Sequence, residues 1–450
     1  MGAKTTKEIA QWVCRSGYQD FGQDLIDYAK NMALSHLGMT VAGTAMPLGK
    51  IATAYVMGRN GSPEAGVLGS GFRTLTEYAA LANGSLAHTT ELEDDSFPEG
   101  LYSCGSWPTV FAVGEKFNLA GKDIIEAYIL GYEVGARLGM ASEKAIADGY
   151  LNAAGCLTIG SAAMAAKLLK LDVEQTTHAL SIAASQANGI ARQTGAGAHL
   201  IEAGFAGRNG ICAATLAELG FTGNPTILEG QGGFMDLWTG QPEFDLPLGE
   251  GYRVYEIGIK KYPCCYLMQR NIDGVLDLID KHDISWNDVE SIEHGINRTV
   301  SLYLKYPQPE SGEDARFSLP HSTVACFFDQ KVFLDSYSDA KAQDPRFAEA
   351  RKKVKVDVHS EWEDGYFAFD SPVTIRLKDG TIHEKVCVDA KGDPSQRLSS
   401  DEVTKKYMDC MDFANTFSRE TVERAADMTL SLDRLEDISE LVELLTFPDK

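Results

Sequence analysis

Apolar residues recur at intervals of three and four along the first half of the chain. Near the amino terminus Ile9, Trp12 and Val13 form one such apolar face. This spacing matches the 3.6-residue period of an amphipathic helix. It predicts helices almost throughout the stretch from Thr5 to about Gly220.

Two of these helices are unusually rich in small residues. Residues 122–142 carry Gly131, Gly135 and Gly139 at intervals of four, and residues 155–169 are rich in Ala, Gly and Ser. A row of small residues lets a neighbouring helix approach closely, so the pattern predicts a tightly packed, buried bundle. Asp172 stands where the next helix should begin, and we expect it to be the N-cap.

The pattern changes near residue 220. Residues 220–252 are rich in Gly and Pro and are expected to form a connector, followed by a helix over 265–282. Alternating apolar and polar positions predict strands beyond the connector. They cover residues 253–260, 289–296 and 353–359, and a hairpin of 372–377 with 382–388. This part of the chain is therefore expected to be α+β.

The helical pattern returns from Ser399 to the end of the chain. We therefore expect a mainly α protein with a smaller α+β domain. The large all-helical domain would be formed by residues 1–252 and 396–450, and the α+β domain, residues 253–395, would be inserted between these two segments.

Composition limits the classes of partner. The 450 residues carry a formal net charge of −23, which argues against nucleic acid or an anionic membrane as a partner but leaves an anionic small molecule open. The nine cysteines are an odd number without ligand-like spacing, which indicates reduced thiols and a cytoplasmic location. The sequence contains no run of 18 apolar residues, so no membrane span is predicted.

The most unusual stretch is His88–Glu115. It places Glu91, Glu93, Asp94 and Asp95 within five positions beside an apolar helix. Such carboxylates must face water, pair with cations, bind a metal or take part in proton chemistry. A solvated acidic helix end is the plainest interpretation of this stretch taken alone. Glu91 and Asp95, four residues apart, would share a helix face, and Glu93 would be solvated.

A series of motifs in order resembles the MmgE/PrpD family, which includes 2-methylcitrate dehydratase, cis-aconitate decarboxylase and iminodisuccinate epimerase. The matching segments are His88–Asp95, Pro108–Glu115, Ser185–Gly210, Phe221–Gly230, Lys260–Cys265 and Phe317–His321. The resemblance covers nearly the whole chain. It implies a large helical domain, an α+β lid, a homodimer, and neither an organic cofactor nor a metal.

The resemblance also implies that half of the catalytic positions have changed. The family Lys of the lid is retained as Lys260, and its catalytic Asp is matched by Glu91. The other matched positions carry different chemistry. The family has Thr at the position of Asp95, His at those of Leu101 and Leu151, Lys at that of His199, and Tyr at that of His321.

These positions define the predicted site. Candidate proton carriers or charged groups are Lys260, His199, His321, Glu91 and Asp95, and candidate pocket-lining residues are Tyr150, Leu101, Leu151, Cys104 and Tyr262. An imidazole with an unperturbed pKa near 6.5 can donate and accept protons at neutral pH. Either histidine could instead serve only as a hydrogen-bonding core residue, and Glu91 could be only a surface charge.

The family chemistry begins with proton abstraction next to a carbonyl or carboxyl group. The expected activity is therefore a cofactor-independent dehydratase, epimerase, decarboxylase or cyclising isomerase. Leu101 and Leu151 remove two of the family's imidazoles, and His199 replaces a fixed cation. These changes favour a less polar, biosynthetic (secondary-metabolite) substrate. Two alternatives stay open. One is an inactive binding or scaffold protein. The other is a Mg²⁺-dependent prenyl or terpene synthase-like enzyme, suggested by Asp94-Asp95-(x)₃-Glu99.

Overall fold

The computed structural model describes residues 2–59, 61–329, 331–367 and 370–449. These residues form two compact units, and the chain enters each of them more than once. Residues 1–192, 200–257 and 399–450 form a helical unit, and residues 193–199 and 258–398 form an α+β unit. Among the described residues, no helix is long and apolar enough to cross a membrane.

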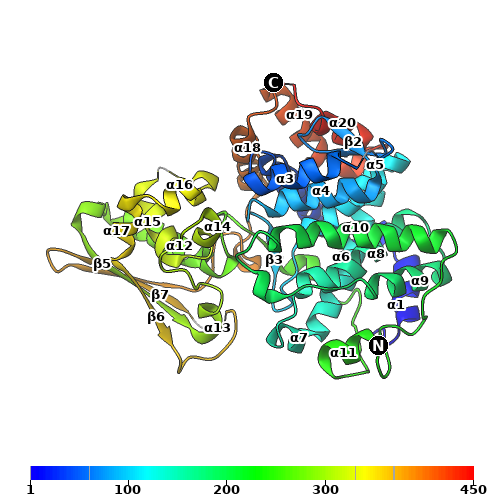
Figure 1. The fold of residues 1–450 in the computed structure, drawn as a ribbon, viewed down its shortest axis with the longest axis horizontal. Coiled ribbons are helices and arrows are strands. Elements are labelled where there is room, and N and C mark those ends of the chain that lie inside the picture. Colours follow the sequence, from blue (N-terminus) through cyan, green and yellow to red (C-terminus); the bar gives the residue numbers. More distant parts are fainter. Residues whose placement is uncertain (1, 60, 330, 368–369, 450) are drawn as a thin grey trace. The chain divides into compact units, whose positions relative to one another are not determined.

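The helical unit contains a bundle of long helices (Figure 1). The helices of the first segments are α1 (Thr6–Arg15), α2 (Gln23–Gly43), α3 (Pro47–Met57), α4 (Thr76–His88), α5 (Ser106–Phe117), α6 (Gly121–Ala141), α8 (Asn152–Leu168), α9 (Val173–Ala184), α10 (His199–Glu218) and the short α7 (Glu143–Ala147) and α11 (Phe234–Thr239). The carboxyl-terminal segment adds α18 (Ser400–Ala414), α19 (Arg419–Leu430) and α20 (Ser439–Thr446). Short strands β1 (Ala65–Val67), β2 (Phe72–Thr74) and β3 (Asp94–Ser96) lie between the helices.

The small residues of α6 and α8 have the role expected from the sequence. A Cβ built on Gly131 would lie 2.6 Å from the carbonyl oxygen of Gly160, and a Cβ on Gly160 would lie 2.6 Å from that of Gly131. The two helices therefore approach too closely for any side chain at these positions. The prediction of a deeply buried, tightly packed helix pair is confirmed. Asp172 is confirmed as the N-cap of α9, where its side chain accepts a hydrogen bond from the amide of Gln175.

The α+β unit is built around a four-stranded sheet with the order β6-β5-β7-β8. Its strands are β5 (Val289–Asn297), β6 (Val354–His359), β7 (Ser371–Leu377) and β8 (Ile382–Cys387). β5 and β6 are parallel, whereas β7 is antiparallel to both β5 and β8. The predicted hairpin and the two predicted strands before it are confirmed.

Helices contact the sheet of the α+β unit. α12 (Gln269–His282) contacts β7 and β8, and α15 (Leu319–Phe328) contacts β6 (Figure 1). The remaining elements are β4 (Ile257–Ile259) and the short helices α13 (Arg298–Ser301), α14 (Gly312–Ala315), α16 (Asp339–Ala342) and α17 (Pro345–Arg351). The helix expected over 265–282 is confirmed, with a 3₁₀ turn at Tyr266–Met268 before α12.

The strand expected over residues 253–260 is shorter than predicted. Residues Arg253–Glu256 form a 3₁₀ turn, and only Ile257–Ile259 is extended. The amide of Arg253 donates to Glu133 Oε2 at 2.6 Å, and its guanidinium binds Glu99. These long-range bonds hold the backbone in a turn despite its alternating sequence. The expectation for residues 253–256 was therefore wrong.

Candidate active site

The candidate site begins where α4 ends at His88. The hydroxyls of Thr89 and Thr90 donate to the carbonyls of Leu86 and Ala87, at 2.8 and 2.7 Å. The amide of Glu91 then donates to the carbonyl of His88 at 3.1 Å, which closes a turn. The threonine hydroxyls add hydrogen bonds to carbonyls of the last helical turn, where the carbonyl of Ala87 also accepts from the amide of Thr90 at 3.3 Å. The chain can therefore leave the helix here inside the protein.

Glu91 occupies this turn in a left-handed backbone conformation, with φ of 52°. Residues other than glycine seldom adopt this conformation, and strain of this kind concentrates at functional sites. Asp95 lies beyond the turn, in β3. The prediction that Glu91 and Asp95 share a helix face was therefore wrong, because the helix ends before either residue.

The acidic stretch is buried. Glu91, Glu93 and Asp94 are 2–3% exposed. The interpretation as a solvated helix end was wrong, and so was the expectation that Glu93 is solvated. One neighbouring cation is Lys406 of α18, whose ammonium donates to the carbonyl of Leu92 at 2.6 Å. A buried cation beside buried carboxylates reduces the cost of keeping both out of water.

Asp94 belongs to the acidic stretch but was not among the predicted site residues. Its Oδ1 accepts a hydrogen bond from the amide of Ser103 at 2.7 Å, and the Ser103 hydroxyl lies 2.9 Å from the Tyr128 hydroxyl. Burial raises the pKa of Asp94 to about 6, although the hydrogen bond from Ser103 opposes this change. A carboxyl with such a pKa can exchange protons near neutral pH.

Leu101 is held by packing and by backbone hydrogen bonds. Its amide and carbonyl pair with Ser96, and its carbonyl also accepts from the Tyr132 hydroxyl at 3.1 Å. Its side chain is fully buried, and a Cβ built on Gly135 of α6 would lie 3.5 Å from Leu101 Cδ2. These are the contacts of a packing residue. Cys104, three residues further on, is also fully buried.

The acidic motif Asp94-Asp95-(x)₃-Glu99 does not have the arrangement of a Mg²⁺ site. Both oxygens of Glu99 are bound by the Arg253 guanidinium, at 3.0 and 2.9 Å, and Glu99 is fully buried. Asp94 is engaged by the amide of Ser103. Two of the three carboxylates of the motif are therefore already hydrogen-bonded to other groups of the protein. This geometry gives no support to the prenyl or terpene synthase alternative.

Tyr150 and Leu151 lie at the start of α8. Tyr150 is 40% exposed, and its ring stacks on the Trp238 ring with a centroid separation of 4.9 Å. Leu151 is the N-cap of α8, and its amide donates to the carbonyl of Gly189 at 3.1 Å. Tyr150 also forms an isolated β-bridge with Ile190, so both residues help to fix the chain at residues 189–190.

In the α+β unit, Lys260 follows β4 directly and is only 3% exposed. Tyr262 donates its hydroxyl to Asp273 Oδ1 at 2.7 Å, and its amide donates to Gln269 Oε1 at 3.0 Å. Burial, followed by the negative charge of Asp273, raises the pKa of Tyr262. Tyr262 thus stays neutral and anchors the segment that follows Lys260.

His321 lies in α15 with both ring nitrogens engaged. Nε2 is 2.8 Å from the carbonyl oxygen of Ser336, and Nδ1 is 3.1 Å from the guanidinium of Arg351. The carbonyl accepts and the guanidinium donates, so the ring is neutral with its proton on Nε2. Burial lowers the pKa of His321 to about 4. These contacts favour a structural role for His321 over the predicted role as a proton carrier.

Three buried side chains come together at the end of α4. One ring nitrogen of His88, one carboxylate oxygen of Glu91 and one ring nitrogen of His199 all lie within 4.8 Å of one another. His199 is the first residue of α10, and the rest of that helix belongs to the helical unit. Glu91 and His199 were predicted as site residues, whereas His88 was missed. The available signal was the spacing of His88 and Glu91, three residues apart at a helix end.

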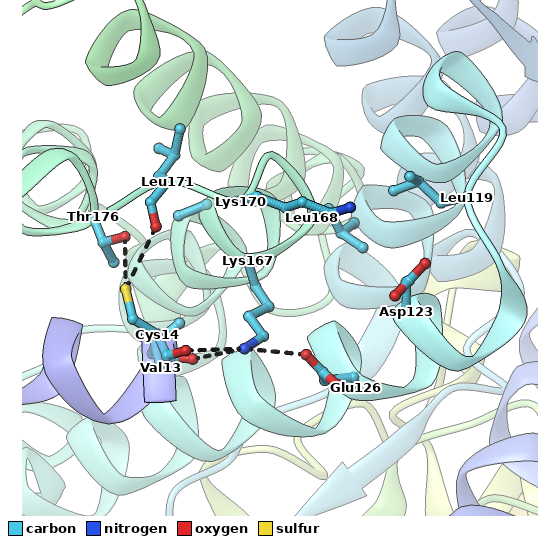
Figure 2. A pocket seen from close by; sticks show the side chains of 11 residues that line it. Val13, Cys14, Leu119, Asp123, Glu126, Lys167, Leu168, Lys170, Leu171 and Thr176 are labelled. Atoms are coloured by element: carbon cyan, nitrogen blue, oxygen red, sulfur yellow. Dashed lines mark hydrogen bonds and ion pairs between the residues drawn. The ribbon is translucent and has the colours of Figure 1, made fainter. Parts of the chain in front are cut away.

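A separate pocket of about 270 Å³ lies between α1, α6 and α8 (Figure 2). Lys167 crosses it and donates to the carbonyls of Val13, Cys14 and Ser16, and it also pairs with Glu126 at 3.1 Å. The ammonium caps the carboxyl end of α1. Lys167 therefore has a structural role in this pocket.

Comparisons with known proteins agree with this arrangement. The model of the MmgE/PrpD N-terminal domain matches residues 7–247, and that of the MmgE/PrpD C-terminal domain matches residues 262–434. The chain belongs to the MmgE/PrpD family. The family resemblance expected from the sequence motifs is confirmed, as is the mainly α fold with a smaller α+β part.

Several relatives are named enzymes. Cis-aconitate decarboxylase of Aspergillus terreus is 27% identical over 99% of this chain and 96% of its own length. Cis-aconitate decarboxylase of Mus musculus is 26% identical over 94% of this chain and 90% of its own length. The mitochondrial 2-methylcitrate dehydratase of Yarrowia lipolytica is 24% identical, over 64% of this chain and 58% of its own length.

Proposed function

We propose that this protein is a lyase or isomerase that transfers a proton at a carbon next to a carboxyl or carbonyl group of a small molecule. The observation that carries the proposal is the buried grouping of His88, Glu91 and His199 in a member of the MmgE/PrpD family. Imidazoles and carboxylates are the side chains most often used for general acid–base catalysis. Relatives named as a decarboxylase and a dehydratase support the same class of chemistry.

Residue roles follow from burial and charge. Glu91 and His199 are proposed to exchange protons with the substrate, together with Asp95 or Asp94. Lys260 is proposed to supply positive charge for the carboxyl group or for the developing enolate, because an ammonium that is 3% exposed acts with little screening by water. His321 is left out of this set, since both of its ring nitrogens are engaged.

The substrate is proposed to carry fewer carboxylates than a tricarboxylate. This chain has His199 where the family resemblance implies a lysine, and a lysine is a fixed cation at neutral pH whereas a histidine is not. Leu101 and Leu151 add no charge where the resemblance implies histidines. The homodimer and the cytoplasmic location expected from the sequence remain part of this proposal.

Substrate preference can be tested directly. Purified protein is incubated separately with cis-aconitate and with 2-methylcitrate, and products are followed by NMR. We expect turnover of both to be far slower than that of the relatives named for them. Turnover of either compound at a relative's rate would refute the proposed preference.

A comparison of metabolites in cells with and without the gene would then identify the natural substrate. The proposed activity predicts that a small carbonyl- or carboxyl-bearing compound accumulates when the gene is removed. An unchanged metabolite profile would favour the scaffold alternative.

A further inference from the structure

The carboxyl-terminal segment supplies a buried cation to the acidic stretch. Lys406 of α18 is 7% exposed, and its ammonium donates to the carbonyl of Leu92 at 2.6 Å, although 314 positions separate the two residues in the chain. Leu92 lies between Glu91 and Glu93. We propose that Lys406 is a positioning residue of the proposed active site, whose ammonium fixes the turn that carries Glu91 and whose charge acts on the neighbouring Asp94. This inference rests on the proposed function and extends it to a residue outside the matching motif segments.

A lysine ammonium is a costly group to bury. Lysine is almost never fully buried unless it is paired, because an isolated charge loses its hydration. An apolar side chain of similar length, such as methionine, would fill the same space without that cost. Packing alone therefore does not explain a cation at position 406, whereas the carbonyl oxygen and the buried carboxylates beside it do.

α18 is held against α2, so the position of the ammonium is well defined. A Cβ built on Gly38 of α2 would lie 3.0 Å from the Cα of Tyr407, which means that the backbones of the two helices are in contact. At the start of α18, the side-chain amide of Asn31 donates to the hydroxyl of Ser400 at 3.1 Å. Because these contacts lie on both sides of Lys406, α18 cannot shift without breaking them.

The turn that carries Glu91 depends on side chains for its backbone hydrogen bonds. The amide of Leu92 donates to the hydroxyl of Thr90 at 3.3 Å, and its carbonyl accepts from Lys406. Neither bond belongs to a helix or a sheet. The left-handed conformation of Glu91 is unfavourable and persists only where the surrounding structure enforces it. Loss of the bond from Lys406 should therefore let the turn relax and move the carboxylate of Glu91.

The imidazole of His36 on α2 lies near Lys406 but does not share its charge. The hydroxyl of Thr40 donates to the carbonyl of His36 at 2.8 Å, so the same hydroxyl accepts from Nε2 of the ring at 3.2 Å. The ring is therefore neutral. Burial, followed by the positive charge of Lys406, lowers the pKa of His36 to about 3. His36 thus adds no positive charge near neutral pH, and the cation beside the acidic stretch is Lys406.

Asp94 is the carboxyl on which the charge of Lys406 acts. Burial raises the pKa of Asp94 to about 6. The hydrogen bonds from Ser103 and the charge of Lys406 oppose this rise, whereas the charge of Glu93 adds to it. Removing the ammonium therefore leaves Asp94 with a higher pKa and protonated over a wider pH range. Proton exchange that involves Asp94 would then move to higher pH.

The test compares Lys406→Met with the wild type, both as the full chain. Each protein is incubated in deuterium oxide with a small-molecule extract of the cells that make it, and the rate of mass change of the altered compound is measured over about pH 5 to 9. Methionine keeps the side-chain length but removes the hydrogen bond and the charge. We expect the rate to fall on the order of 10- to 100-fold, because the carboxylate of Glu91 is displaced. The pH profile of the remaining activity should move to higher pH, because Asp94 loses a neighbouring cation.

The adjacent residue of the same helix provides a matched control. The side chain of Lys405 is 71% exposed and pairs with Asp409 at 3.2 Å, so Lys405→Met should keep the wild-type rate and pH profile. Lys406→Arg keeps the charge and should keep the wild-type pH profile at a lower rate. Lys406→Gln removes the charge but keeps a hydrogen-bond donor, and it should show the same pH shift as Lys406→Met. Circular dichroism and melting temperature establish which variants are folded.

The outcomes separate this inference from the proposed function. A wild-type protein that alters no compound of the extract at any pH would refute the proposed function itself. An active wild type matched in rate and pH profile by Lys406→Met would overturn the role of Lys406 alone. A fall in rate that is equal at every pH in the folded Lys406→Met and Lys406→Gln variants would also overturn it, because a purely structural residue gives that result.

Discussion

The pair formed by Arg253 and Glu99 anchors the loop that follows the acidic stretch. The guanidinium makes two hydrogen bonds to the carboxylate, at 3.0 and 2.9 Å, and one to the carbonyl of Phe97 at 3.0 Å. The side chains of Arg253 and Glu99 are 12% and 0% exposed. Replacing Arg253 with Met keeps much of the side-chain volume but leaves a carboxylate buried without this cation.

The expected cost can be worked from these contacts. Hydrogen bonds to charged groups contribute about 1.5–3 kcal/mol each, so losing two costs about 3 kcal/mol at the lower bound. Breaking a buried ion pair from one side costs about 3–5 kcal/mol. We therefore expect Arg253→Met to lower the free energy of unfolding by about 3–5 kcal/mol. The double variant Arg253→Met/Glu99→Gln should recover about 2 kcal/mol of this loss, because no buried charge then remains without a partner.

The assay is urea-induced unfolding, followed by both circular dichroism and tryptophan fluorescence because the chain has two units. The control is Arg298→Met, since the ion pair of Arg298 with Asp364 is 68% and 51% exposed and should contribute about 0–1 kcal/mol. A loss below about 1 kcal/mol in Arg253→Met, or a double variant no more stable than the single one, would refute the reasoning.

Three further predictions concern single residues. Because the folded-state pKa of Asp94 is raised to about 6 from 3.8, the wild type should lose about 3 kcal/mol of stability as pH rises through that interval. In Asp94→Asn the melting temperature should vary less between these pH values than it does in the wild type. A variant whose melting temperature depends on pH as the wild type's does would contradict the burial argument. Burial lowers the folded-state pKa of His321 to about 4 from 6.5. The folded protein therefore holds the neutral imidazole, and the stability that this form contributes should be lost as pH falls through that interval. His321→Ala should lower the melting temperature at pH 7 while leaving the pH dependence of turnover unchanged, and a shifted turnover profile would restore it as a proton carrier. Leu101→His should destabilise the protein by about 1–3 kcal/mol in urea unfolding and gain no turnover of cis-aconitate, because its side chain packs on α6; new decarboxylase activity would show instead that position 101 faces the substrate.

The fold was largely readable because its signals are local. The spacing of Gly131, Gly135 and Gly139 predicted close helix packing, and turn residues between two alternating segments predicted the β7–β8 hairpin. Residues 253–256 were misread because long-range bonds from Arg253 to Glu133 and Glu99 override the local alternation.

The site was less readable, because its geometry depends on residues far apart in the chain. Nothing local shows that Glu91 turns into a buried position near His199. The engagement of both nitrogens of His321 depends on Ser336 and Arg351, which are also distant in sequence. Motif comparison could mark these positions, but only the contacts separate a structural histidine from one available for chemistry.

The proposed proton-transfer activity is tested most directly by isotope incorporation. The purified protein is incubated in deuterium oxide with a small-molecule extract of the cells that make it, and masses are compared before and after. We expect at least one carbonyl- or carboxyl-bearing compound to gain deuterium or change mass with the wild type and with the control Lys261→Met, since the side chain of Lys261 is 44% exposed. The change should disappear with Glu91→Gln and with Lys260→Met. An extract that no form of the folded protein alters, or one altered equally by all four, would contradict the account.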